Sequence, residues 1–126
     1  MTKHEKKTLT KLASQTCQAR DGHECLRCSK TTTLCASHIY PKGMHRKMEY
    51  DLDNLKTLCY RCHMHFWHRN PIEAWEWLQK TLPKKRLDRL KLRSQVIDKT
   101  PLDYNLLKLY FENELEKHNK SCYNTV

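Results

Sequence analysis

The chain has 126 residues and a formal net charge of +10. This length predicts one domain, or a small core with helical extensions, and a core of this size buries a low fraction of its surface. The basic balance favours a polyanionic partner, with nucleic acid ahead of an anionic membrane. A run of about 18 apolar residues is absent, which excludes a transmembrane helix, and the first residues lack the apolar core of a signal peptide. We therefore expect a cytoplasmic protein without a membrane partner.

The first half of the sequence predicts a helix followed by two strands. In chain order it predicts a basic amphipathic helix over residues 1–20, a strand over 34–39, an exposed polar loop over 44–52, and a turn with a short strand over 51–58. The helix is expected to end at Asp21-Gly22, because glycine adopts the left-handed cap conformation at little cost. Pro41 and Gly43 break the chain after the first strand.

The second half predicts helices over residues 60–67, 71–82, 84–96 and 101–118, and a frayed tail from Asn119 onward. Pro71 stands at a favoured first-turn position of the second of these helices. The stripe that faces the core there is predicted to be Trp75, Leu78 and Leu82. The apolar residues of the last helix are Leu102, Leu106, Leu109, Tyr110 and Phe111. They suit packing within the monomer and contact with a partner equally well.

Two Cys-x-x-Cys pairs, Cys25/Cys28 and Cys59/Cys62, provide four thiolates, the number that completes a tetrahedral structural zinc site. In a chain without an export signal, this spacing favours reduced, metal-binding thiols over disulfides. The alternative is four ordinary buried thiols, and we prefer structural Zn²⁺. The cysteines without a partner at ligand spacing are predicted to be buried or incidental thiols: Cys17, Cys35 and Cys122.

Three further residues have the types that phosphodiester hydrolysis requires. Such a reaction needs a base that activates water and a cation that neutralises the charge on the phosphate and the leaving oxygen. A neutral histidine is a base near pH 7, which suits His38. The Asn54 amide can brace a neighbouring loop, and the His63 ring can hold a hydrated divalent cation. The alternative is that His38 only ends a strand and His63 only lies beside the zinc cluster.

Two segments, LCASHIYP at 34–41 and DLDNLKTLCYRCH at 51–63, resemble the HNH endonucleases. The likeness is to the small zinc-containing phage type, near the NinG-like and endonuclease VII-like groups, and spans residues 25–95. It implies an α+β fold with a ββα-metal (His-Me finger) core held by the four-cysteine zinc site and flanked by α-helices. A hairpin would carry His38 and Asn54, and a helix would carry His63.

The resemblance also implies a DNA endonuclease. His38 would deprotonate water as general base, while Mg²⁺ or Mn²⁺ bound by His63 bridges the scissile phosphate and the leaving oxygen. The products would carry 5′-phosphate and 3′-hydroxyl ends, and the protein would be phage-encoded and act in a bacterial host cell. Three stretches follow from it: a basic N-terminal helix (1–22), the zinc-held HNH core (23–70) and a helical extension (71–126).

One position departs from the family pattern. Many HNH enzymes have a metal-binding Asp or His immediately before the general base, where this chain has Ser37. A hydroxyl is a poorer ligand than a carboxylate, so the ion would depend on His63, with Ser37 and His68 as further candidate ligands. His65 is expected to point away from the site because it lies two residues from His63. This departure keeps a second function open, a non-catalytic zinc module that binds DNA or a protein.

Basic residues outside the motif are candidate DNA contacts: Arg46, Lys47, Lys84, Lys85, Arg86, Arg89, Lys91 and Arg93. A charge run is usually only a solvated face, but beside a nuclease centre we favour phosphate contact. Such binding would be weakly sequence-specific and strongly salt-dependent. Trp67, Trp75 and Trp77 are assigned to the core. The oligomeric state stays open, and cleavage of both strands by a protein with one site would imply a dimer.

Overall fold

A computed structural model describes the backbone of residues 1–124 and the side chains of residues 1–119. This part of the chain combines helices with a small two-stranded sheet, which confirms the mixed class. The regular elements are α1 (Lys3–Arg20), β1 (Leu34–His38), β2 (Leu55–Cys59), α2 (Pro71–Thr81), α3 (Lys84–Ser94) and α4 (Tyr104–Asn124). Two 3₁₀ turns, η1 (Arg46–Met48) and η2 (Leu52–Asn54), precede β2, and a π-helix, η3 (Cys62–Trp67), follows it.

Helix α1 has clear start and stop signals. The Glu5 N–H donates to Thr2 Oγ1 at 3.0 Å and the Thr2 N–H donates to Glu5 Oε1 at 2.8 Å, which forms a capping box. The helix ends at Asp21, and Gly22 follows with φ of 77°. Its buried face includes Leu9 and Cys17, eight residues apart, as expected for one stripe of an amphipathic helix. The predicted helix is confirmed.

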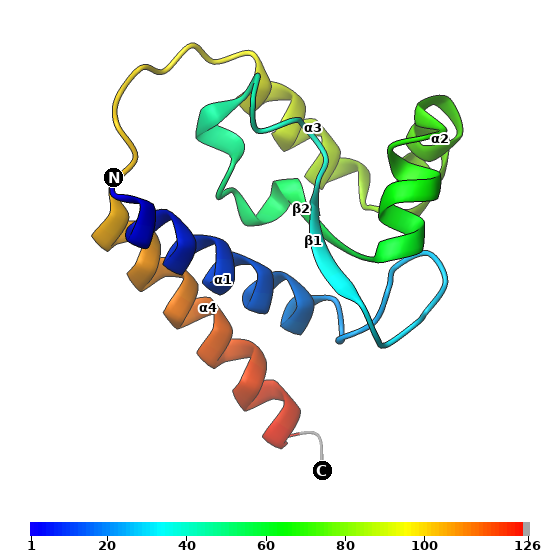
Figure 1. Ribbon diagram of the computed structural model, residues 1–126, viewed down its shortest axis with the longest axis horizontal. Coiled ribbons are helices and arrows are strands. Elements are labelled where there is room, and N and C mark those ends of the chain that lie inside the picture. The colour runs from blue at the N-terminus through cyan, green and yellow to red at the C-terminus, as the bar shows by residue number, and fades with distance from the viewer. Residues whose placement is uncertain (125–126) are drawn as a thin grey trace.

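Helix α4 runs beside α1 (Figure 1). It begins at Tyr104 instead of residue 101 and continues to Asn124. The prediction of a frayed tail from Asn119 is therefore wrong for residues 119–124. Residues 125 and 126 lie outside the described part. Phe111 is fully buried in the cluster of α1, whereas most of the other apolar residues named for this helix are exposed: Leu106, Leu109 and Tyr110.

The sheet is an antiparallel pair of β1 and β2, in which Ser37 lies opposite Lys56 and His38 lies opposite Leu55. Ala36 and Leu55 pack into the cluster that contains the buried residues of α1, so this face of the hairpin is covered by α1. Side chains alternate along a strand, and Ser37 and Lys56 therefore point to the other face, toward η3. The hairpin lies between these two helical layers.

The segment between the strands differs from its prediction. The sequence predicts an exposed loop over residues 44–52, yet Met48, Tyr50 and Leu52 are buried. Met48 packs in one cluster with Leu78, while Tyr50 and Leu52 pack in the cluster of α1. Apolar side chains at every second position thus anchor this segment on both sides, which fixes its backbone carbonyls beside the hairpin.

Helices α2 and α3 pack against the segment that follows β1, in one cluster with Ile39 and Met48. Leu78 and Leu82 are buried as predicted, but Trp75 is 39% exposed, and Ala74 takes the inward position instead. Ala74 and Leu78 are four residues apart and share one helix face, from which Trp75 is turned away. Trp67 and Trp77 are partly buried and pack against the core, as predicted.

Candidate metal centre and candidate active site

The four cysteines of the two Cys-x-x-Cys pairs converge on one point. The Sγ atoms of Cys25, Cys28, Cys59 and Cys62 all lie within 4.8 Å of one another, and those of Cys28 and Cys59 are 3.6 Å apart. Four sulfurs at about 2.3 Å from a tetrahedral ion lie about 3.8 Å apart. The cluster can hold a metal ion, and its donor set and spacing are those of structural zinc. The predicted four-thiol site is confirmed at this level.

Backbone N–H groups prepare one thiol of this cluster for ionisation. Burial raises the pKa of Cys25, but hydrogen bonds from the backbones of Cys59, Cys28 and Arg27 outweigh burial and lower that pKa to about 7. For Cys62, burial dominates and raises the pKa to about 12. Cys25 is therefore the first of these two to ionise, and a bound cation would replace the proton of Cys62.

The other cysteines lie apart from this cluster. Cys17 is buried and contacts Thr57 Oγ1 at 3.4 Å, and Cys35 is half-buried and donates to the Leu58 carbonyl at 3.4 Å. Both have ordinary packing partners, in agreement with a role as incidental thiols. Cys122 lies outside the described side chains.

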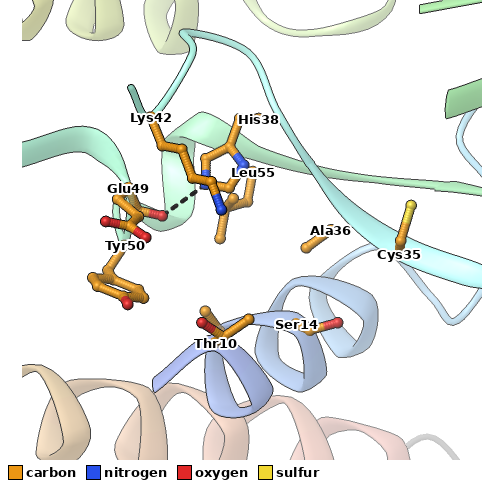
Figure 2. Close-up of a pocket in the computed structure, with 10 residues that line it drawn as sticks. Thr10, Ser14, Cys35, Ala36, His38, Lys42, Glu49, Tyr50 and Leu55 are labelled. Atoms are coloured by element: carbon orange, nitrogen blue, oxygen red, sulfur yellow. Dashed lines mark hydrogen bonds between the residues drawn. The ribbon is translucent and has the colours of Figure 1, made fainter. Parts of the chain in front are cut away.

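The His38 ring lines a cavity of about 210 Å³ between β1, α1 and the segment before β2 (Figure 2). Its Nε2 lies 2.9 Å from the Glu49 carbonyl oxygen. A carbonyl only accepts hydrogen bonds, so Nε2 carries the proton and the neutral ring keeps a lone pair on Nδ1. Burial, assisted by the charges of Lys42 and Lys56, lowers the pKa of His38 below its ordinary 6.5. The neutral base form therefore prevails at neutral pH.

Asn54 is fully buried and uses its whole amide. Its Oδ1 accepts the Tyr40 N–H at 2.8 Å, and its Nδ2 donates to the carbonyls of Tyr40 at 3.0 Å and Met48 at 2.9 Å. Met48 immediately precedes Glu49, whose carbonyl holds the His38 ring. Asn54 thus joins the end of β1 to the segment that orients His38, which is the bracing contact expected of an amide at this position.

The π-helix η3 explains how two histidines five residues apart face each other. The His68 N–H donates to the His63 carbonyl at 3.1 Å, and the Nε2 atoms of the two rings are 3.3 Å apart. Two nitrogens bound to one ion at about 2.1 Å lie about 3.0–3.4 Å apart. The pair therefore has the spacing of two ligands of one metal ion. His65 is exposed and stacks edge-on with Tyr60 instead, which agrees with its predicted direction.

Ser37 lies behind His63. Its side chain is fully buried, and its Oγ lies 2.9 Å from His63 Nδ1 and 3.0 Å from the Lys56 amine. A ligating histidine commonly donates its second N–H to such an outer partner. This geometry makes Ser37 a hydrogen-bond partner of the His63 ring. Its hydroxyl is fully buried and is not exposed to a solvent-filled cavity where it could bind a metal ion.

Lys56 was not predicted as a site residue from the sequence. It is fully buried on β2, and its amine also donates to the His38 carbonyl at 3.3 Å and lies 3.3 Å from the centroid of the Trp67 ring. Burial lowers its pKa to about 6. The available signal was a lysine between Leu55 and Thr57 in a strand that is otherwise apolar or uncharged.

The two candidate catalytic histidines approach the end of β1 from opposite faces. Ser37 and His38 are neighbours on the strand, so the His38 ring lies on the α1 side and His63 lies against Ser37. Burial lowers the pKa of His63, and repulsion from His68, Lys56 and His38 lowers it further. Both rings thus border the end of β1, where a phosphate shared by the two histidines would have to lie.

Several of the predicted DNA contacts have partners inside the protein. Arg86 donates to the carbonyls of Asp53 and Leu55, and Arg89 and Arg93 pair with Asp53 at 3.2 and 3.0 Å. Lys47 pairs with Asp98 at 3.5 Å. The remaining candidates are exposed: Arg46, Lys84, Lys85 and Lys91. Arg86 is half-buried, whereas Arg89 and Arg93 pair with Asp53 at the surface, and the three arginines together hold α3 against η2 and the start of β2.

The chain matches no family model, no curated protein and no solved structure. None of the described helices combines the length and the apolar composition that a membrane span requires.

Proposed function

We propose that the protein is a metal-dependent DNA endonuclease with an HNH-type, ββα-metal centre formed by the β1–β2 hairpin and η3. The observation that carries this proposal is the orientation of His38. A buried amide, Asn54, fixes the segment whose Glu49 carbonyl accepts a hydrogen bond from His38 Nε2, so the neutral ring keeps its unprotonated nitrogen, Nδ1, as the base. A histidine that only ends a strand does not require such a brace.

In the proposed reaction, His38 Nδ1 accepts a proton from the water that attacks the scissile phosphate. His63, with His68 beside it, would hold a divalent cation, Mg²⁺ or Mn²⁺, which supplies positive charge to the phosphate and the leaving 3′ oxygen. Two imidazole ligands suit Mn²⁺ better than Mg²⁺, which prefers oxygen ligands. We therefore expect higher activity with Mn²⁺. The products would carry 5′-phosphate and 3′-hydroxyl ends.

The four-thiol cluster would hold a structural Zn²⁺ separate from this reaction. It joins the residues before β1 to the end of β2 and the start of η3, so a bound ion would hold together the open end of the hairpin, where Leu34 lies opposite Cys59. DNA is the proposed substrate because the chain carries a net charge of +10. The exposed lysines of α3 and Arg46 are the proposed phosphate contacts.

The test is nicking of a supercoiled plasmid by the zinc-loaded protein with added Mn²⁺ or Mg²⁺. The His38→Ala variant should lose about 10²- to 10⁴-fold in rate, the usual contribution of a general base, and should still bind DNA. His65→Ala is the matched control, since this ring is exposed and away from His63, and it should cut like the wild type. Equal rates for His38→Ala and the wild type would reject the proposal.

A second function has one observation in its favour. The position of the usual carboxylate ligand is held by Ser37, whose buried hydroxyl is already hydrogen bonded. This favours a zinc-stabilised module that binds DNA or a protein without cutting. Wild-type protein that binds DNA but cuts neither DNA nor RNA with either ion would support this alternative. Cleavage of RNA alone would replace DNA by RNA as the proposed substrate and would still support metal-dependent phosphodiester hydrolysis.

A further inference from the structure

The buried lysine of β2 has no acidic partner. Lys56 is fully buried, and among the described residues no carboxylate forms an ion pair with it. Lysine is rarely fully buried unless it is paired, because removing its amine from water is costly. Its contacts here are Ser37 Oγ, the His38 carbonyl and the face of Trp67. Each of these groups belongs to, or directly supports, the candidate active site.

We propose that Lys56 is a positioning residue of the candidate nuclease centre, which joins the general base to the metal-binding histidine. Its role in catalysis rests on the proposed function, whereas its effect on the histidine rings does not. One N–H of the amine reaches the backbone of His38 at 3.3 Å, and another reaches Ser37 Oγ at 3.0 Å, which in turn contacts His63.

The hydrogen bonds explain how an amine that touches neither ring can orient His63. Ser37 Oγ has two lone pairs, so it can accept one N–H from Lys56 and a second from His63 Nδ1. This arrangement places the His63 proton on Nδ1 and leaves the lone pair of Nε2 directed at His68. Without the amine, the Ser37 hydroxyl can turn and donate to Nδ1, and the His63 proton then moves to Nε2. That tautomer cannot bind a cation through Nε2.

The same lysine holds η3 against the hairpin. Trp67 lies four residues after His63 on η3, and its ring covers the amine at 3.3 Å from the centroid. The amine thus contacts η3 through Trp67 and, by way of Ser37, through His63. A buried lysine with a merely structural role would stabilise the fold without determining which nitrogen of His63 carries the proton.

The test is a long-range ¹H–¹⁵N NMR spectrum of the histidine rings in zinc-loaded, ¹⁵N-labelled protein without DNA. In the wild type, His63 should carry its proton on Nδ1. In Lys56→Met, which keeps the chain length over Trp67, the Nε2-protonated form should become the major one, while His65 stays unchanged. Ser37→Ala removes the same link and should give the same result if Lys56→Met does not fold. An unchanged His63 tautomer in either folded, zinc-loaded variant would overturn the proposal.

The kinetic measurement separates positioning from binding. Loss of an outer partner of a metal ligand typically costs about 10- to 100-fold, so kcat of plasmid nicking by Lys56→Met should fall by this factor, with KM within about twofold of the wild type. A higher KM with unchanged kcat would also overturn the proposal. If the wild type cuts no DNA, the proposed function fails, and the ring spectra still decide the role of Lys56.

Discussion

The base strength of His38 is determined by its surroundings at the end of β1. Burial lowers the pKa of this ring below 6.5, so the neutral form persists to more acidic pH than in an exposed histidine. As pH falls through the lowered pKa, the ring protonates and cannot accept a proton from water.

We therefore expect the acid limb of the nicking rate, measured against pH at saturating Mn²⁺, to lie below pH 6.5. An NMR titration of His38 in the absence of DNA should give a midpoint in the same range. A limb at or above pH 6.5 would contradict the role of His38 as the base. The unfolded chain takes up this proton first, at about pH 6.5, so the buried His38 also weakens folding as pH falls below that value.

Asn54 is expected to support both stability and activity. Asn54→Ala leaves the N–H and the carbonyl of Tyr40 without their Asn54 partner and leaves the Met48 carbonyl only the longer bond from the Asp51 N–H at 3.4 Å. Each buried unsatisfied group costs about 1–3 kcal/mol. After some relaxation, we expect a loss of about 2–4 kcal/mol in the free energy of unfolding, measured with urea on zinc-loaded protein. The exposed Asn105→Ala is the control and should change it by less than about 0.5 kcal/mol. Equal stabilities of the two variants would show that the brace is dispensable.

At the scale of elements, the hairpin depends on its neighbours. A two-stranded sheet is at best marginally stable alone, and here α1 covers one face while η3 and Trp67 cover the other. The start of α2 was predictable because a first-turn proline is a local signal. The first strand was predicted from the β-branched residues of the stretch 31–39, although β1 itself (Leu34–His38) contains none of them. The pairing of the four cysteines was predictable from spacing alone.

Other features were not predictable because they depend on partners distant in the sequence. The exposed-loop prediction followed the basic residues around Arg46, whereas Met48, Tyr50 and Leu52 are drawn inward by clusters on either side. The pairing of His63 with His68 requires a π-helix, which apolar periodicity does not indicate. Lys56 became part of the candidate site only through the strand register that places it opposite Ser37.

Helix α4 gives a test of which apolar residues belong to the core. Phe111 is fully buried against α1, and Phe→Ala in a core typically costs about 3–5 kcal/mol, so Phe111→Ala should lower the free energy of unfolding by this amount. Leu109 is 56% exposed on the same helix, and Leu109→Ala should change it by less than about 0.5 kcal/mol. A large loss of unfolding free energy in Leu109→Ala that depends on protein concentration would instead reveal a contact between two copies of the chain.

Helix α3 separates structural arginines from candidate DNA contacts. Lys91 is exposed, whereas Arg86 donates to two backbone carbonyls near β2. Lys91→Ala should leave stability unchanged and reduce the salt dependence of DNA binding by about one unit of slope in log Kd against log salt. Arg86→Ala should mainly lower stability, because the Asp53 carbonyl loses its Arg86 donor and the Leu55 carbonyl keeps only the one from Arg20. Fluorescence anisotropy at several salt concentrations and urea unfolding measure the two effects. A loss of stability in Lys91→Ala, or a change only in the salt dependence of DNA binding in Arg86→Ala, would contradict this prediction.

For the whole molecule, the four-thiol cluster links parts of the chain that packing alone holds weakly. It ties the turn after α1 to the end of β2 and the start of η3, in a chain of only 126 residues. Structural zinc binding contributes about 10–16 kcal/mol in small zinc-dependent domains, whereas the net stability of an ordinary domain is about 5–15 kcal/mol. Loss of the ion should therefore remove most or all of the net stability.

We expect one zinc per chain in the purified protein, measured by elemental analysis. A chelator should abolish its cooperative thermal unfolding and reduce its helical circular dichroism. Cys25→Ser should lose the metal and show the same loss of structure without a chelator. Cys35→Ser, a change of the same chemistry outside the cluster, should retain both zinc and fold. A metal-free protein that unfolds at the wild-type temperature would show that the hydrophobic clusters hold the hairpin by themselves. The histidine site would then be independent of the cysteines.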